Sequence, residues 1–229
     1  MIKLAISGAA GRIGRTIYKS LIGSEEFEPT FGVDVFAADD LPYPVYRSFA
    51  DSPFDVDVVV DFSSPAALDD LLAYAFAKKA KLVIATTGFT PAQQRRIEAA
   101  SKEIPVFQAS NMSLGVNLLG SLAKDAAKFL GEDYDIEIVE THHNHKLDAP
   151  SGTALTLANE INSVRDGALV PTYGRHESKH RREKNEIGIH AVRGGTVVGK
   201  HEVMFLGTGE VITLAHESEN KEVFVRGAL

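Results

Sequence analysis

The sequence predicts an α/β protein with two parts: an N-terminal Rossmann-type domain on a parallel sheet, and a C-terminal α+β domain with an open, mainly antiparallel sheet. In the first half, short apolar runs alternate with helical patterns, the order that gives parallel sheets. A glycine-rich turn follows the first apolar run directly. In the second half, three strand-like runs follow one another without a helix between them.

Strands and helices of the first half can be placed from their apolar patterns. The run Asp55–Phe62 has a continuous apolar centre, which is typical of a strand buried on both faces. Thr90-Pro91 combines a capping side chain with a first-turn proline and predicts a helix start. Together the patterns predict strands at residues 2–7, 30–35, 55–62, 81–85 and 105–109, and helices at 16–22, 65–79 and from 91 onward. This order predicts parallel strands with right-handed crossovers.

The second half has a different pattern. It predicts helices at 115–130 and 151–161, strands at 134–141, 186–193, 196–205 and 210–215, and a polar loop over 165–185. Gly194-Gly195 and Gly207–Gly209 separate the last three strands, so we expect an antiparallel meander there, with Arg193–Gly195 as a hairpin turn. The change of pattern divides the chain into residues 1–112, to which residues 217–229 return, and residues 113–216.

Composition limits the classes of function. The chain has 229 residues, 44% of them hydrophobic, enough for one large core or two small ones. Its net charge of −7 argues against nucleic-acid and membrane binding. It has no cysteine, which excludes disulfides and thiolate metal sites, and no apolar run approaches the roughly 20 residues of a membrane span. The start reads as a strand and not as a signal peptide, and the lack of cysteine fits a reducing cytoplasm.

The glycine-rich turn predicts a dinucleotide site. Gly8–Gly14 has the spacing G-x-x-G-x-x-G between an expected strand and an expected helix, where backbone N–H groups can bind a pyrophosphate. Asp34 ends the second strand about 20 residues on, where a carboxylate can accept hydrogen bonds from a ribose. Val35 follows instead of a cation for a 2′-phosphate, which favours NADH over NADPH. Arg12, or a residue of the loop 37–46, is the alternative phosphate partner.

A second cluster predicts acid–base chemistry on an anion. His142, His143, His145 and Lys146 lie within five residues and lead into Pro150–Thr153, which reads as a helix start. Such a start can hold a carboxylate or phosphate. Strand alternation would place His143 and His145 on one face of the strand and His142 on the other. No HExxH pattern or cysteine completes a ligand set, so we predict no metal site. We expect Asp148 to cap the helix, with orientation of Lys146 as the alternative. We expect the basic segment 175–184 to be a solvated loop, with contact of Arg175 or Arg182 to a neighbouring subunit as the alternative.

Several stretches together resemble the dihydrodipicolinate reductase family of lysine and diaminopimelate biosynthesis. The resemblance extends over nearly the whole chain. It rests on Gly8–Gly14, Asp61–Ser63, Thr86–Phe89, Asn111–Asn117, Glu140–Thr153, Glu186–Gly195 and Gly199–Val203. The run His-His-x-His-Lys-x-Asp-Ala-Pro-Ser-Gly-Thr is its most specific part.

This resemblance implies a reductase that transfers hydride from NADH or NADPH to 4-hydroxy-tetrahydrodipicolinate, a cyclic dicarboxylate, giving tetrahydrodipicolinate and water. It implies catalysis by His142 and Lys146, substrate contact by His143, and carboxylate binding by Gly152 and Thr153. The implied cofactor residues are Gly8, Ala9, Ala10, Gly11, Arg12, Ile13, Asp34, Ala85, Thr86, Thr87, Ala109, Ser110, Asn111 and Met112. Family members are cytoplasmic homotetramers joined through the open sheets of a second domain that binds substrate.

The chain departs from the family pattern in two places. Lys221 stands where the family usually has arginine, and family chains continue past Leu229, so we expect a truncated sequence. Two other function classes stay open. One is another nicotinamide enzyme, such as an amino-acid or semialdehyde dehydrogenase. The other is a non-enzymatic NAD-sensing protein, which would have no need for Lys146.

Overall fold

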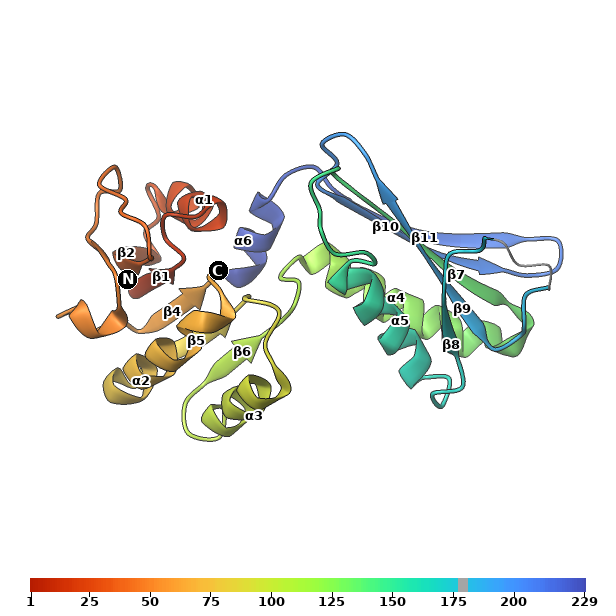
Figure 1. Ribbon diagram of the computed structural model, residues 1–229, viewed down its shortest axis with the longest axis horizontal. Coiled ribbons are helices and arrows are strands. Elements are labelled where there is room, and N and C mark those ends of the chain that lie inside the picture. The colour runs from red at the N-terminus through yellow and green to blue at the C-terminus, as the bar shows by residue number, and fades with distance from the viewer. Residues whose placement is uncertain (177–180) are drawn as a thin grey trace. The chain divides into compact units, whose positions relative to one another are not determined.

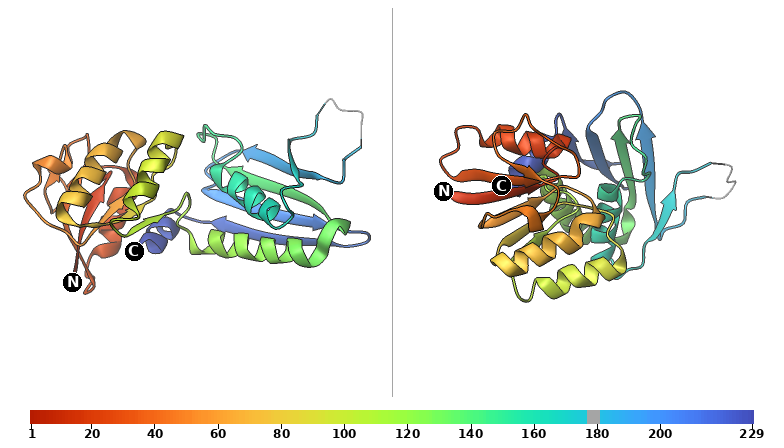
Figure 2. Two further views of the ribbon diagram at one scale, coloured as in Figure 1. Left: turned by 90° about the horizontal axis from the view of Figure 1, so that it is seen from below. Right: turned by 60° about the vertical axis from the view of Figure 1, so that its left-hand side comes forward.

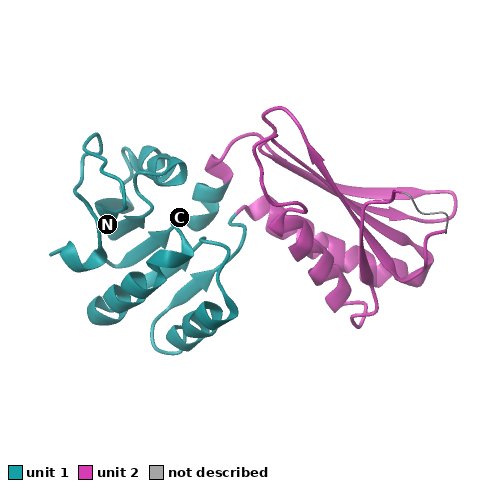
Figure 3. Cartoon of the chain, viewed as in Figure 1, with its two compact units in different colours: residues 1–112, 224–229 teal, residues 113–223 magenta. Residues whose placement is uncertain are grey.

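The computed structural model describes residues 1–176 and 181–229 (Figure 1). The chain forms two compact units (Figure 3): unit 1 contains Met1–Met112 and Phe224–Leu229, and unit 2 contains Ser113–Val223. The segment belonging to unit 1 at the end of the chain starts at Phe224 and not at residue 217, because the last strand of unit 2 continues to Ser218.

Unit 1 is built on a six-stranded sheet with the order β3-β2-β1-β4-β5-β6, and every neighbouring pair is parallel. This confirms the predicted Rossmann-type sheet. Its strands are β1 (Ile2–Ser7), β2 (Phe27–Val33), β3 (Val45–Tyr46), β4 (Val58–Asp61), β5 (Lys81–Ile84) and β6 (Val106–Gln108). The helices are α1 (Arg12–Leu21), α2 (Leu68–Lys78), α3 (Pro91–Ala100) and the final α6 (Glu222–Ala228), with 3-10 turns η1 (Phe49–Asp51) and η2 (Pro65–Ala67).

The parallel sheet is buried on both faces. Side chains of β1 alternate between two cores: Ala5 packs with α2 and α3, whereas Leu4 and Ile6 pack with α1. Val225 of α6 joins the second of these cores. Capping of α3 follows the prediction, since the Thr90 hydroxyl accepts a hydrogen bond from the N–H of Gln93 at 3.2 Å. Because helices cover both faces, the carboxyl ends of the strands are the part of the sheet that is open to a ligand.

Unit 2 contains a five-stranded sheet with the order β11-β10-β7-β9-β8. Its strands are β7 (Asp135–His142), β8 (Val170–Tyr173), β9 (Glu186–Arg193), β10 (Gly199–Leu206) and β11 (Val211–Ser218). Strand β10 is antiparallel to β7 and β11, whereas β9 is parallel to β7 and β8. The sheet is therefore mixed: the predicted α+β unit with an open sheet and antiparallel strands is confirmed, whereas the two parallel pairs of β9 were not expected. Strand β8 also lies inside the segment that we expected to be a loop.

The expected antiparallel meander is wrong at the connection between β9 and β10. Strand β7 lies between β9 and β10, so these two consecutive strands are not neighbours. The chain between them crosses the end of β7: the N–H of Gly194 donates to the carbonyl of His142 at 2.9 Å, and the N–H of His143 donates to that of Val197 at 2.7 Å. Two glycines signal a change of direction, but they do not say which strand will pair with the next.

Two helices, α4 (Leu114–Leu130) and α5 (Gly152–Ser163), lie against one face of this sheet, and the 3-10 turn η3 (Gly131–Asp133) follows α4 (Figure 2). Leu119, Leu157 and Ile161 of the helices pack with Ile138 and Phe205 of the sheet in a single core. Among the described residues of unit 2, no helix lies over the other face of the sheet. No helix in the described residues is long and apolar enough to cross a membrane.

Candidate active site

The glycine-rich turn of unit 1 leaves little room for side chains. Gly8 has a positive φ of 81°, and a Cβ atom there would lie 2.5 Å from the carbonyl oxygen of Phe62. A Cβ atom at Gly14 would lie 2.3 Å from the carbonyl oxygen of Gly8. Gly11, the N-cap of α1, has no side chain to cap the helix. The backbone of the turn is thus open to close approach, and the start of α1 is suited to bind phosphate.

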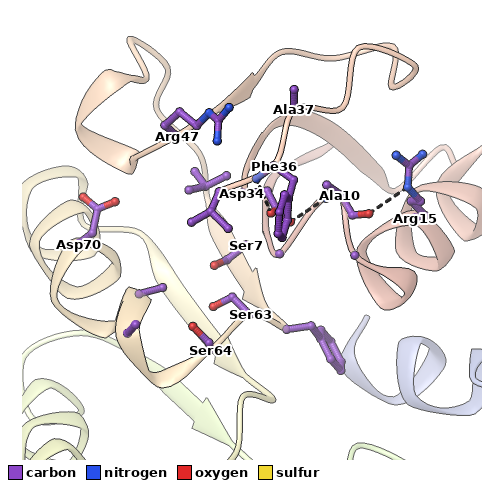
Figure 4. Close-up of a pocket in the computed structure, with 17 residues that line it drawn as sticks. Ser7, Ala10, Arg15, Asp34, Phe36, Ala37, Arg47, Ser63, Ser64 and Asp70 are labelled. Carbon is purple, nitrogen blue, oxygen red and sulfur yellow. Dashed lines mark hydrogen bonds between the residues drawn. The ribbon is translucent and has the colours of Figure 1, made fainter.

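A cavity of about 570 Å³ lies beside this turn (Figure 4). Asp34 lines it: one carboxylate oxygen accepts from the N–H of Ala10 and the other from the N–H of Phe36, both at 3.0 Å. Ser7 lines the same cavity, and its buried hydroxyl has no hydrogen-bond partner among the described residues. An unpaired buried hydroxyl, a glycine backbone and an uncapped helix start fit the polar groups of a dinucleotide.

The predicted cofactor residues meet this cavity only in part. Those that line it are Gly8, Ala10, Gly11 and Asp34. Ala9 is buried in the core behind the turn, and Arg12 and Ile13 form the first turn of α1. Segments 85–87 and 109–112 follow β5 and β6, at the same edge of the sheet, but they are not among the lining residues. Parallel strands explain the shared edge, because their carboxyl ends all meet there.

Sequence reasoning missed other residues of this cavity. They include Ser7, Arg15, Phe36, Arg47, Ser63 and Ser64. Arg15 forms an ion pair with Asp40, whereas the exposed Arg47 forms no ion pair within the described residues. The N–H of Ser63 donates to the hydroxyl of Thr86 at 2.9 Å, so Thr86 holds the loop after β4 in place. Position directly after a predicted strand was the signal that could have identified Ser63 and Ser64.

In unit 2, the end of β7 directs two ionisable side chains to the helix-covered face. Glu140 is fully buried and His142 is 8% exposed, because residues two apart in a strand share a face. His142 Nδ1 lies 2.6 Å from Glu140 Oε2. The imidazole packs against the backbone of β10, where a Cβ atom at Gly199 would lie 3.0 Å from His142 Nε2. The predicted catalytic histidine is therefore held in a closely fitted, polar environment.

Arg193 is the third member of the cluster of Glu140 and His142. It ends β9, and the parallel register places it beside His142. Its Nη1 donates to Glu140 Oε2 and its Nη2 donates to Glu140 Oε1, each at 2.7 Å. Nη2 also donates to the carbonyl of Asp148 at 2.8 Å. The expectation of a hairpin turn at Arg193–Gly195 is wrong, because β7 separates β9 from β10. The Arg193 side chain instead forms a bidentate ion pair with a buried carboxylate.

The start of α5 is tied to the same carboxylate. Ser151 is the N-cap: its hydroxyl accepts from the N–H of Ala154 at 3.2 Å. The N–H of Ser151 donates to Glu140 Oε1 at 3.0 Å, and its hydroxyl lies 3.1 Å from His201 Nε2. Ser151 is thus the N-cap residue. The Asp148 carboxylate also accepts a hydrogen bond from the backbone of Gly152 in the first turn, which helps to lower its pKa, and it lies 2.8 Å from the ammonium of Lys146.

The other predicted substrate residues lie around this helix start. His143 and Lys146 belong to the turn after β7, where the N–H of Lys146 donates to the carbonyl of His143 at 3.1 Å. Gly152 and Thr153 form the first turn of α5, and a Cβ atom at Gly152 would meet no atom within 4 Å. Among residues 1–176 and 181–229, no group of three His, Cys, Asp or Glu side chains is placed to hold a metal ion.

Burial and hydrogen bonding set the charges of the cluster. Burial raises the pKa of Glu140, but the hydrogen bonds from Arg193, His142 and Ser151 outweigh it, so this pKa lies below its ordinary value. Burial lowers the pKa of His142 against the opposing effect of Glu140, and it lowers the pKa of His201 to about 4. At neutral pH the cluster therefore contains an ionised carboxylate beside neutral imidazoles.

The basic segment near residue 175 is not simply solvated. Arg175 Nη2 and Arg182 Nε both donate to Glu137 Oε1 at 3.0 Å, and Arg175 also pairs with Glu186 at 2.6 Å. These contacts bind the segment to the sheet of its own chain, which corrects the expectation of a solvated loop. Residues 177–180, part of the same basic cluster, lie outside the described residues.

His201 makes the stability of unit 2 depend on pH. Because its pKa is about 4 in the folded chain and ordinarily near 6.5, the unfolded chain binds a proton first as the pH falls. The unfolding free energy therefore decreases between about pH 6.5 and pH 4. We expect the unfolding free energy, measured by urea denaturation, to fall from pH 7 to pH 5 in both the wild type and His201→Asn. The decrease should be about 2 kcal/mol smaller in His201→Asn. Equal losses in both proteins would contradict a neutral buried His201.

Comparisons with known proteins agree with these features. Residues 2–112 match the family model of the dihydrodipicolinate reductase N-terminus, and residues 115–229 match that of its C-terminus. A 4-hydroxy-tetrahydrodipicolinate reductase of Clostridium novyi (strain NT) is 46% identical over 229 residues, which cover 100% of this chain and 90% of that protein. The enzyme of the same name from Caldanaerobacter subterraneus subsp. tengcongensis is 49% identical with the same coverage.

Solved structures give the same result. A dipicolinate-bound dihydrodipicolinate reductase from Paenisporosarcina sp. TG-14 matches with a TM-score of 0.78 and 28% identity, covering 99% of this chain and 91% of that one. The NAD complex of GenD2, from gentamicin A biosynthesis, matches with a TM-score of 0.61 and 16% identity over 93% of this chain and 72% of that one, a likeness of fold alone. The chain therefore belongs to the dihydrodipicolinate reductase family.

Proposed function

We propose that the chain reduces 4-hydroxy-tetrahydrodipicolinate to tetrahydrodipicolinate and water, in lysine and diaminopimelate biosynthesis. The observation that carries the proposal is the cluster at the end of β7, where His142, Lys146 and the start of α5 follow one another in unit 2. Relatives with 46% and 49% identity carry this activity in their names, and a solved relative binds dipicolinate, a cyclic dicarboxylate. The cytoplasm stays a prediction from the sequence.

The reaction adds one hydride and one proton to the substrate and releases one water. A bound reduced nicotinamide supplies the hydride. Loss of the substrate hydroxyl as water gives a conjugated imine. Hydride addition to this imine leaves negative charge on the substrate, and a proton must neutralise it. We assign this proton to Lys146, whose ammonium is held 2.8 Å from Asp148, and acid–base assistance to His142. His143, on the same turn, is assigned to substrate contact.

The start of α5 is suited to a substrate carboxylate. Ser151 caps the helix with its own side chain, and the space beside the α-carbon of Gly152 is open. Backbone N–H groups and the helix dipole favour an anion there. We assign this carboxylate to Gly152 and Thr153. In unit 1, we assign the dinucleotide to the cavity beside the glycine-rich turn, with the predicted segments after β5 and β6 completing the site.

Steady-state kinetics should distinguish the proposed roles of Lys146 and Thr153. We expect Lys146→Ala to lower kcat by roughly 10²-fold, because a positioned proton donor is lost. We expect Thr153→Val to raise KM for the dicarboxylate by roughly 10-fold, because a hydrogen bond to a charged group is lost. The assay couples the protein to a dihydrodipicolinate synthase and follows the absorbance of the reduced cofactor. An unchanged kcat for the lysine variant, or an unchanged KM for the threonine variant, would remove that residue from the site.

We further propose that NADH serves at least as well as NADPH. The Asp34 carboxylate lines the cavity where the ribose is expected and would repel a 2′-phosphate. Arg47 also lines the cavity as an exposed cation and can offset that repulsion. We expect Arg47→Ala to lower kcat/KM about 5-fold more with NADPH than with NADH, the size of an exposed charge pair. A strong NADPH preference in the wild type would contradict this assignment.

The uncovered face of the five-stranded sheet supports a homotetramer. On this face, Val192 is 47% exposed and Val211 is 58% exposed, although β-branched side chains favour burial. We propose that copies of the chain associate through this face. Sedimentation velocity at micromolar concentration should show a tetramer, and Val211→Glu should dissociate it because a charge would be buried. A wild-type monomer would disprove the proposal.

A further inference from the structure

The carboxylate of Glu140 is the centre of a buried hydrogen-bond network in unit 2. It is fully buried and accepts four hydrogen bonds. Oε1 accepts from the backbone of Ser151 and from Arg193, at 3.0 and 2.7 Å. Oε2 is bonded to His142 and to Arg193, at 2.6 and 2.7 Å. Both oxygens are satisfied, which a buried carboxylate requires.

The charges of this network determine the proton on His142. Arg193 is always protonated and binds Glu140 through two parallel hydrogen bonds, which favours the ionised carboxylate. An ionised carboxylate can only accept hydrogen bonds. The 2.6 Å contact therefore requires a proton on His142 Nδ1, so the neutral ring carries its lone pair on Nε2.

The same carboxylate also fixes the helix start. Ser151 donates its backbone N–H to Glu140 one residue before Gly152, where α5 begins. His201 lies on the other side of Ser151, with Nε2 3.1 Å from its hydroxyl, and its ring lies edge-to-face with that of His142 at 5.2 Å. The imidazole and the helix start are thus held in one position relative to each other.

We propose that Glu140 is a positioning residue: it holds His142 in the Nδ1–H tautomer and sets the start of α5, with Arg193 as its counter-ion. This inference rests on the proposed function, which gives His142 and the helix start their roles. It extends that function to residues that act through others. Glu140 itself is placed on no substrate atom.

A purely structural role is the competing explanation. Removing one partner of a buried ion pair destabilises a protein whatever its function, so a loss of stability alone decides nothing. Glu140→Gln is nearly isosteric, but its amide offers one acceptor oxygen where the carboxylate offers two. It therefore cannot satisfy Arg193 and His142 as before. Glu132→Gln makes the same chemical change at an exposed position of unit 2 and serves as the matched control.

The decisive measurement is the tautomer of His142, read from ¹⁵N NMR of the labelled protein. We expect the Nδ1–H form in the wild type and in Glu132→Gln, and a mixture of tautomers in Glu140→Gln. We expect Glu140→Gln to lose at least about 10-fold in kcat and to bind pyridine-2,6-dicarboxylate more weakly by calorimetry. The dissociation constant for NADH should stay within about twofold, because its proposed site lies in unit 1.

Several results would overturn the inference. An Nε2–H tautomer in the wild type would do so without any variant. Wild-type kcat and dicarboxylate affinity in Glu140→Gln would do so as well, as would lost activity with an unchanged tautomer. If Glu140→Gln does not fold, Arg193→Lys keeps the charge, and so the ionised carboxylate, but loses the bidentate geometry. We then expect the Nδ1–H tautomer to persist while kcat and the affinity for pyridine-2,6-dicarboxylate fall, and a shifted tautomer or wild-type values of both would overturn the inference. An inactive wild type would instead refute the proposed function, while the NMR result would still decide the tautomer.

Discussion

The buried charge of Glu140 is the constraint on which the arrangement of unit 2 depends. A carboxylate without water needs partners on both oxygens, and here they come from β7 itself, from β9 and from the start of α5. The central place of β7 makes this possible, because strands on both sides bring side chains to its end. Parallel β9 ends with Arg193 beside His142, and antiparallel β10 carries His201 on the other side. A hairpin of β9 and β10 would separate His142 from one of them.

Local patterns predicted most elements of the fold, but not β3, β8 and α6, and not the pairing of the strands in unit 2. In unit 1, alternating strands and helices allow few topologies, and the parallel sheet follows from that order. In unit 2, the glycines near residue 194 predict a turn equally well whether the chain forms a hairpin or crosses the end of β7. Only long-range packing decides between these outcomes. Strand β8 was missed because four residues with a proline, Val170–Tyr173, carry little pattern of their own.

In the candidate site, too, local motifs could be predicted from the sequence, whereas long-range contacts could not. His142 and Lys146 could be identified because they share one short motif with a helix start. Arg193 could not, since it lies 53 residues from Glu140 and its side chain reaches the carboxylate only through the register of two strands. Ser151 lies within the motif, but only the geometry of the helix start shows that its side chain caps α5. In unit 1, the sequence shows Ser7 only as the last residue of a strand. The structure shows that its hydroxyl is buried and has no hydrogen-bond partner among the described residues.

The Glu140–Arg193 pair is a poor source of stability. Two charges must lose their hydration, and apolar side chains of similar volume often replace a buried ion pair without loss. What apolar side chains cannot supply is an acceptor for His142 Nδ1. With that proton held in place, Nε2 of the neutral ring accepts a hydrogen bond and does not donate one. Proton donation then falls to Lys146, which Asp148 holds on the same turn. On this proposal, two neighbouring basic residues of one motif have opposite roles, because only one of them faces a buried carboxylate.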